Sequence, residues 1–537
     1  MRSRVLFAVL TVTAISTPSF AGDTTVSSGY KIGRELAIPD HLKDDDEFRM
    51  PVTDLLEFGK KLFKANWTEQ DGGGRPLAKG TGLALSDPSS PLVGSRSFNR
   101  ISGPDANSCY GCHNQPHGIA GGSGDFVTNV FVLGQRFDFV TLDSADHRAT
   151  RGAVDEQLNP VSLQTVGNMR KTTGMFGAGY VEMIAREMTA ELQKERGTIN
   201  LGERKQLISK GISFGWLSRR MDASWDMSEV TGLPRESLVS PVPNIPPTLV
   251  IRPWHQAGNV VSIREFTNNA LVQHHGIQTT ERFGIDTDPD GDGVMNELTR
   301  ADVTAISLFQ AVMAPPGRVI PNDPKIERAI INGEQTFAKL GCGGCHTPTL
   351  SLAKENTVYS EPNPFNPPTN LRRGQTKDVV VDLAARELPQ PRLSAEPLTG
   401  VVDVPVYSDF KLHDITDAND PAAAEPLDMN QTVWSAKFSQ GNRRFLTRRL
   451  WGVGNTPPYF HNGMFTTLRQ AILAHAGEAL QSRKSFQAAN AYDQDSLIEF
   501  LKSLQVLPPG TTELVVDENY QKKVWGKQET RLSAASR

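Results

Sequence analysis

The placement of the cysteines constrains this chain more than any other feature of its sequence. Four cysteines occur among 537 residues, and all of them fall in two copies of the pattern Cys-x-x-Cys-His. This pattern is the attachment signature of c-type haem, in which two thiols bond to the haem vinyl groups and the next residue's imidazole binds the iron. The residues concerned are Cys109, Cys112 and His113 in the first copy, and Cys342, Cys345 and His346 in the second.

Paired cysteines have three other common uses, namely a redox dithiol, a structural disulfide and a zinc site. A redox dithiol does not need the histidine that follows each pair. Zinc requires four ligands brought together, whereas the two pairs lie far apart in the sequence. Since both pairs carry the histidine and no cysteine is left over, we expect two covalently bound haem c groups, with His113 and His346 as iron ligands.

The N-terminus has the features of a secretory signal peptide. Arg2 and Arg4 precede an apolar run over 5–15, and small residues follow at Ser19 and Ala21. We expect the mature protein to be periplasmic or secreted, which fits haem attachment outside the cytoplasm. No later stretch reaches the roughly 18 apolar residues of a membrane span. A net charge of −4 without a basic stretch argues against a nucleic-acid partner.

The apolar residues favour a mainly α fold, with two cytochrome c-like haem domains and long loop insertions. Their spacing predicts helices at 52–67, 181–194, 203–221, 301–313, 325–340, 467–476 and 495–504. The proline-rich stretch 351–410 is expected to be a covering insertion. We divide the chain into a signal peptide (1–21), an N-terminal arm (22–50), a first haem domain with a helical insertion and a calcium-type loop (51–323), a C-terminal cytochrome c domain (324–507) and a tail (508–537).

A further motif at 286–297 matches the twelve-residue calcium loop. Carboxylates stand at positions 1, 3 and 5, glycine at position 6 and glutamate at position 12. Gly293 departs from the pattern, because position 8 is usually apolar. The expected calcium ligands are Asp286, Asp288, Asp290, the backbone carbonyl of Asp292, and Glu297. The alternative is a solvated acidic turn that binds no ion.

With these motifs placed, the chain resembles the bacterial di-haem oxidoreductase family, relatives of the di-haem cytochrome c peroxidases. The resemblance covers roughly residues 50–505. It is carried by four stretches: 98–108 (FNRISGPDANS), 281–284 (ERFG), 451–463 (WGVGNTPPYFHNG) and 471–478 (AILAHAGE). The Pro-Pro-Tyr-Phe-His-x-Gly part is shared with the peroxidases themselves. The resemblance implies two haems and a peroxidase-like activity.

Each motif supplies one iron ligand, so the opposite face of each haem needs a group from elsewhere. In the related peroxidases, the second haem takes a methionine from the helix after the Pro-Tyr-Phe-His turn. Here that place holds His475, and no methionine follows Met464. We predict that His475 binds the second iron and lowers its potential relative to histidine–methionine ligation. The alternative is that His475 ends its helix, and that His461 or water binds the iron.

Several other residues are candidates near the haems. His461, in a tight turn, contacts a haem edge or only fixes the loop. His274, His275 and the nearby Glu281 are candidate catalytic residues at the first haem, because peroxide cleavage needs a group that takes a proton. Either histidine could instead be a sixth ligand or a hydrogen-bonded interior residue. Trp451 has two possible roles: it lies between the haems and carries electrons, or it is simply part of the core.

These features together favour a redox enzyme. The first haem is expected to meet the oxidant, with peroxide as the leading substrate, and the second to pass electrons from a small redox protein or another donor. Oxidation of a partner protein or an organic molecule is the alternative reaction. A non-catalytic electron-transfer cytochrome, with both irons six-coordinate, is the alternative class. Thiol–disulfide exchange is incompatible with cysteines that are bonded to haem.

Overall fold

The computed structural model describes residues 32–73, 106–130, 167–289, 292–417, 419, 424–428, 430–431 and 435–525. The signal peptide, the end of the tail and residues 98–105 of the family resemblance lie outside these ranges. The chain divides into Met1–Arg34 and one compact unit, Glu35–Arg537. None of the described helices combines the length and the apolar character that a bilayer crossing requires.

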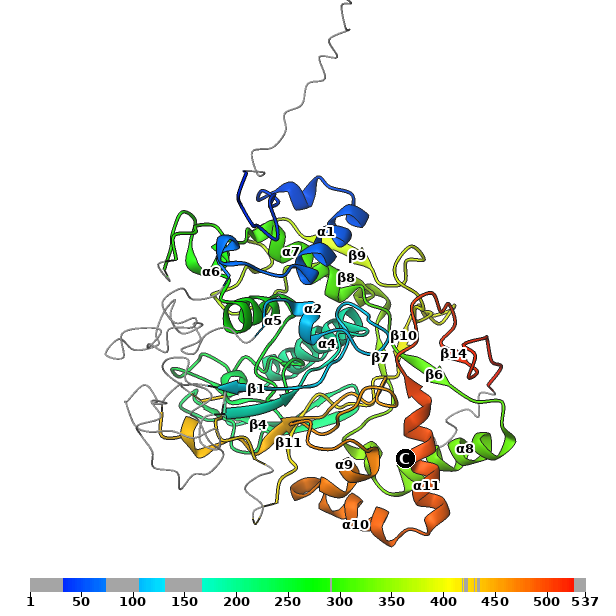
Figure 1. Cartoon of the computed structure of the whole chain (residues 1–537). Helices are drawn as coiled ribbons and strands as arrows, with labels where there is room; N and C mark the ends of the chain where they lie inside the picture. Colours follow the sequence, from blue (N-terminus) through cyan, green and yellow to red (C-terminus); the bar gives the residue numbers. More distant parts are fainter. Residues whose placement is uncertain are drawn as a thin grey trace, which may run out of the picture. The chain divides into compact units, whose positions relative to one another are not determined.

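The described helices belong to the compact unit and are distributed along its whole length (Figure 1). The longer ones are α1 (Val52–Lys64), α4 (Ala178–Gly197), α5 (Ile263–Ala270), α7 (Arg300–Ala311), α8 (Pro324–Lys339), α10 (Leu480–Ala488) and α11 (Ala491–Ser503). Shorter ones are α2 (Cys109–Cys112), the π-helix η7 (Leu271–His275), α6 (Thr280–Phe283), the 3₁₀-helix η8 (Cys342–Gly344) and α9 (Leu468–Ala474).

Strands form small separate sheets. Two-stranded antiparallel sheets pair β1 (Phe126–Val130) with β2 (Gly167–Lys171), β7 (Leu350–Leu352) with β10 (Val402–Val404), β8 (Val358–Glu361) with β9 (Val379–Asp382), and β11 (Leu412–Asp414) with β12 (Arg444–Leu446). Three-stranded sheets have the orders β3 (Arg204–Ser209), β4 (Ile212–Arg219), β5 (Trp225–Asp226) and β13 (Leu504–Gln505), β6 (Gly317–Val319), β14 (Val515–Val516).

The predicted mainly α fold is therefore wrong, and the fold is a mixture of helices and small sheets. The segment 351–410 shows one reason. Its prolines suggested an irregular cover, yet short strands of alternating burial, such as Val379–Asp382, form between them. A strand of three or four residues is too short to produce a clear alternation signal against the rest of a sequence.

A second reason is the range 203–221, which was predicted to be helical and is a β-hairpin. Lys210 and Gly211 connect its two strands, and both have positive φ angles, of 49° and 78°. Ser209 pairs directly with Ile212 across this two-residue turn. Positive φ at both central residues is the geometry of a type I′ turn, which suits the right-handed twist of a hairpin. The turn thus overrides the helical spacing of the apolar residues.

The helices that precede the two haem motifs are confirmed, and each crosses a later helix closely. Helix α1 packs on α7, and α8 packs on α11 (Figure 1). A Cβ atom at Gly59 of α1 would overlap the backbone carbonyl of Ala305, and one at Gly333 of α8 would overlap that of Ser496. Glycine thus permits close backbone approach at both crossings. The same arrangement occurs beside each motif.

Candidate functional site

The second motif lies directly after helix α8, whose N-terminus is stabilised by a capping side chain and a proline. Asp323 accepts a hydrogen bond from the backbone of Lys325, and Pro324 occupies the first turn. After the helix, Gly341 takes a positive φ of 80° and the chain turns through η8. The backbone N–H of His346 then donates to the carbonyl of Cys342, at 3.0 Å. This compact turn brings both cysteines and the histidine to one place.

All four motif cysteines are free of disulfide bonds and partly buried. Those of the second motif line a cavity of about 460 Å³, together with His346, His461 and His475. This volume lies within the ~300–1,000 Å³ typical of cofactor sites. Apolar side chains form much of the wall, including those of Phe337, Leu468, Ile472, Leu497 and Leu501. The donor set and the wall fit a large, flat, mostly apolar group such as haem.

The rings of His346 and His475 lie at about the separation expected of two imidazoles that bind one metal ion. Their ring centroids are 6.5 Å apart. Two imidazoles on opposite sides of one ion should be about 6.4 Å apart, given a metal–nitrogen bond of about 2 Å and a centroid-to-nitrogen distance of about 1.2 Å. The structure thus brings together the two residues that the sequence assigned to the second iron.

Both rings are also oriented by second contacts. The Nδ1 atom of His346 lies 3.2 Å from the carbonyl oxygen of Tyr407, and that of His475 lies 2.7 Å from the carbonyl oxygen of Ala471. A carbonyl partner requires Nδ1 to carry the proton, which makes Nε2 the available ligand atom. The same pattern recurs in the first motif, where Nδ1 of His113 lies 3.0 Å from the carbonyl oxygen of Gly122.

Burial keeps these imidazoles neutral and so available to a metal. It lowers the pKa of His113 to about 4, and it lowers the pKa of His346 to about 4 with a further contribution from nearby His475. Burial lowers the pKa of His475 as well. A protonated imidazole cannot bind iron, so a depressed pKa favours ligation at neutral pH.

Positive side chains also line the cavity. Arg448, Arg449 and Lys171 all contribute to its wall. Burial lowers the pKa of Arg448 to about 10 and that of Arg449 to about 9, and it lowers the pKa of Lys171 to about 7. Mutual repulsion adds to the effect at Arg449 and Lys171. An anionic ligand would offset both the burial and the repulsion, and haem carries two propionate carboxylates.

His461 and Trp451 lie in the wall of the same cavity. The His461 ring stacks on Phe445, with centroids 3.7 Å apart and planes inclined by 16°. Trp451 packs against Gly177, where a Cβ atom would overlap the indole. Both positions agree with the predicted surroundings of the haem. Whether His461 touches a haem edge and whether Trp451 carries electrons stay predictions.

The first motif forms the short helix α2. Two histidines near it, His274 and His275, have different surroundings. His275 is engaged at both nitrogens, with Nδ1 2.8 Å from the carbonyl of Ala106 and Nε2 3.3 Å from Sγ of Cys109. His274 is half-buried and close enough to His113 for its charge to lower the pKa of that residue. Both residues belong to the π-helix η7, a local irregularity that is frequent at functional sites.

Glu281 has a different environment from these histidines. It is buried, and it forms an ion pair with Arg264 and accepts a hydrogen bond from Asn268. Arg264 itself is fully buried and also pairs with Glu361 at 3.3 Å. These contacts suit a structural ion pair, because a buried guanidinium needs carboxylate partners. The catalytic role proposed for Glu281 stays a prediction.

The calcium-type loop is described except for Asp290 and Gly291, which lie outside the described residues. Asp288 accepts hydrogen bonds from the backbone of Asp292 and Gly293, at 3.1 and 3.0 Å. Asp286 accepts one from the Asn296 side chain at 2.8 Å, and Glu297 accepts one from the backbone of Gln278 at 2.6 Å. The carboxylates thus already order the loop, and calcium binding stays a prediction.

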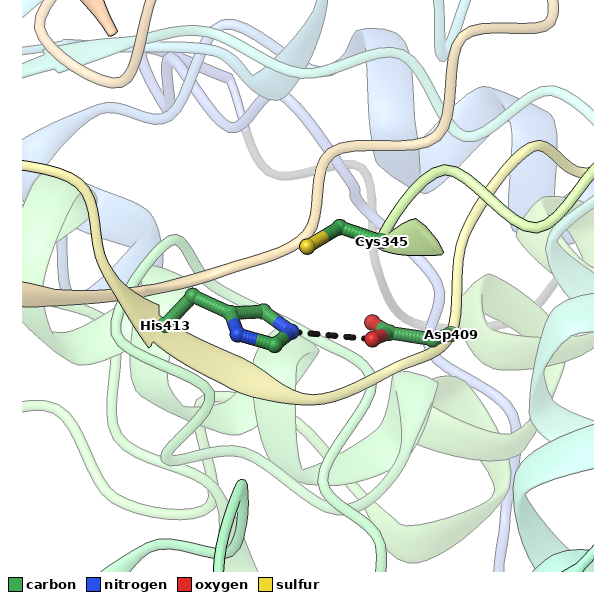
Figure 2. A group of neighbouring side chains, drawn as sticks. All are labelled: Cys345, Asp409 and His413. Carbon is green, nitrogen blue, oxygen red and sulfur yellow. Dashed lines mark hydrogen bonds and ion pairs between the residues drawn. The ribbon is translucent and has the colours of Figure 1, made fainter. Parts of the chain in front are cut away.

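One cluster was not found from the sequence, and it lies beside the second motif. Asp409 and His413 come close to Cys345, with their ligand atoms all within 4.8 Å of one another (Figure 2). Burial lowers the pKa of His413, but hydrogen bonds with Asp409 and Cys345 outweigh this effect and raise it to about 10. Nothing in the local sequence of His413 indicates these partners.

Comparison with known proteins identifies a family for the last part of the chain. Residues 402–504 match the family described as "Di-haem oxidoreductase, putative peroxidase". The matched segment includes Trp451, His461 and His475 and excludes both Cys-x-x-Cys-His motifs. The resemblance seen in the sequence is therefore confirmed over residues 402–504, and the family matched there is one of di-haem oxidoreductases.

Comparisons over longer parts of the chain are weaker. Hydrazine synthase from Kuenenia stuttgartiensis is similar at 13% identity and a TM-score of 0.33, over 90% of this chain and 100% of the other. A MauG-like protein associated with microbial copper homeostasis is similar at 16% identity and a TM-score of 0.25, over 47% of this chain and 73% of the other. TM-scores this low do not establish a common fold. No curated protein matches the sequence.

Proposed function

We propose that this chain is a periplasmic or secreted di-haem c-type oxidoreductase that uses peroxide as its oxidant. A small redox protein or another donor would supply the electrons. The observation that carries the proposal is the 6.5 Å separation of the His346 and His475 rings in the wall of a cavity that Cys342 and Cys345 also line. Haem, when bound, supplies a redox-active iron whose potential depends on its axial ligands.

The chain's own residues would hold and orient the two haems. Cys342 and Cys345 would form the thioether bonds in the second site, with the imidazoles of His346 and His475 on opposite faces. The cations Arg448, Arg449 and Lys171 would balance the propionates. In the first site, Cys109 and Cys112 would form the bonds and His113 would be the ligand on one face. We propose the second site as the electron relay, since ligands on both faces leave no position for peroxide.

We propose the first site as the reaction site, with His274 as its acid–base group. Peroxide cleavage requires a proton to leave one oxygen and reach the other, and a nearby imidazole can carry it on a ring nitrogen. His274 is half-buried and lies near His113, whereas His275 is only 3% exposed and its Nδ1 atom faces the carbonyl oxygen of Ala106. This contrast favours His274 of the two candidates.

Replacing His274 with alanine should therefore slow peroxide-dependent oxidation of an artificial electron donor. General acid–base groups typically contribute about 10²–10⁴-fold, so we expect at least about a hundredfold loss in the rate at pH 7. His117→Asn is the matched control, because His117 is an exposed histidine with a positive φ of 62° that asparagine tolerates. An unchanged rate in His274→Ala would exclude this role. A wild-type protein without any peroxide turnover would favour the carrier function.

We also propose that the loop 286–297 binds calcium. Hard carboxylate oxygens at the spacing of the calcium loop are the basis for this proposal. Dialysed wild-type protein should contain about one calcium ion per chain, and Asp286→Ala and Glu297→Gln should each lose it, as measured by elemental analysis. Asp517→Asn, in another acidic turn that accepts backbone hydrogen bonds, should keep it. Equal calcium in wild type, Asp286→Ala and Glu297→Gln would contradict the proposal.

A further inference from the structure

The segment 407–415, here called the strap, contacts the immediate neighbourhood of both histidines in the second site. At its start, the carbonyl oxygen of Tyr407 is the Nδ1 partner of His346, at 3.2 Å. At its end, the carbonyl oxygen of Ile415 accepts a hydrogen bond from the backbone of Ala476, at 3.0 Å. Ala476 directly follows His475. One short stretch of chain therefore contacts both His346 and the residue that follows His475.

His413 lies within the strap, and its side chain links Asp409 of the strap to Glu478, which lies three residues after His475. The Nε2 atom of His413 lies 2.9 Å from Oδ2 of Asp409, as Figure 2 shows, and its Nδ1 atom lies 2.7 Å from Oε2 of Glu478. The other carboxylate oxygen of Glu478 accepts a hydrogen bond from the backbone of Asp414, at 3.0 Å. Charge-assisted hydrogen bonds of this kind are among the stronger ones in proteins.

The turn after His475 is fitted tightly against the strap. Gly477 has a positive φ of 51°, and a Cβ atom there would overlap the carbonyl of Asp414. The helix before the turn offers less support. Helix α9 has seven residues, and Leu468 is its one buried residue. Such a short helix has little stability of its own, so contacts with the strap help to fix the position of His475.

The close group of Cys345, Asp409 and His413 does not suggest an additional metal site. Both ring nitrogens of His413 already contact carboxylate oxygens, and Cys345 belongs to the haem motif. The group instead places the imidazole of His413 beside the cysteine next to His346 (Figure 2). A role in holding the second site together accounts for all of these contacts.

We propose that His413 is a positioning residue for the second iron site. By bonding to Asp409 and Glu478 at once, it holds the strap so that His346 and His475 keep the separation at which both bind one iron. This inference rests on the proposed ligation by His475. It adds that the pairing of the two ligands depends on a third histidine that does not touch the iron.

The test compares ferric electron paramagnetic resonance spectra of wild type, His413→Ala and Glu478→Gln. Breaking a charge-assisted hydrogen bond shifts a local equilibrium by about tenfold or more. We therefore expect the high-spin fraction of the second haem to rise about tenfold or more in both variants, while the first haem keeps its signal. Glu499→Gln, which removes an ion pair with Lys502 on α11, is the control and should match wild type. Added imidazole should restore the low-spin signal in His413→Ala.

The outcomes separate this inference from the proposed ligation. A high-spin second haem in the wild type would show that His475 is no ligand. A low-spin second haem in the wild type that stays low-spin in both His413→Ala and Glu478→Gln would overturn the role of His413 alone. Glu478→Gln preserves the shape of the side chain, so its spectrum reports on the strap even if His413→Ala folds poorly.

Discussion

Replacing His475 with alanine is expected to convert the second haem from a low-spin to a high-spin ferric centre. The ring centroids of His475 and His346 are 6.5 Å apart, and the contact of the His475 Nδ1 atom with the Ala471 carbonyl leaves Nε2 as the ligand atom. Alanine removes the imidazole that we assign to that face, so the conversion should be close to complete. Electron paramagnetic resonance of the oxidised protein measures it directly.

Two further variants distinguish His475 from the alternative ligand. His475→Met should keep a six-coordinate iron and raise its potential, because a thioether favours ferrous iron more than imidazole does. His461→Ala should leave the low-spin signal in place, since the His461 ring stacks on Phe445. If His461→Ala removes the low-spin signal and His475→Ala does not, the assignment of the two residues is reversed.

Replacing Cys342 and Cys345 together with serine is expected to remove one of two covalent haems. Serine cannot form the thioether bonds, so the haem of the second site would be lost when the protein is denatured. Mass spectrometry of the denatured chain should show one haem fewer than in the wild type. The corresponding change at Cys109 and Cys112 should remove the other haem. Each of the two double variants is therefore the control for the other. Two haems remaining in either variant would contradict the assignment of that motif.

The sequence predicted the helices near the motifs well because several signals agreed there. The helix predicted at 325–340 is observed as Pro324–Lys339, where apolar periodicity coincides with a capping aspartate and a proline in the first turn. The range 203–221 had periodicity alone, and the turn at Lys210 and Gly211 made it a hairpin. The small sheets were missed because strands of a few residues depend on partners that are remote in the sequence.

The candidate site was predictable where a motif or a family pattern identified it. The motif residues and His475 fall into this class, and the structure brings His475 opposite His346. Neither source indicated His413, because its partner Glu478 lies 65 positions away and the contact depends on the fold. Likewise, the difference in burial between His274 and His275 became visible only in the fold.

The central claim is that both motifs hold haem covalently, and one measurement on the wild-type protein tests it. After expression with export to the periplasm, the mass of the denatured chain should equal that of the mature polypeptide plus two haems, and the four cysteines should not react with a thiol reagent. A mass equal to that of the polypeptide alone, with all four cysteines reactive, would contradict the account.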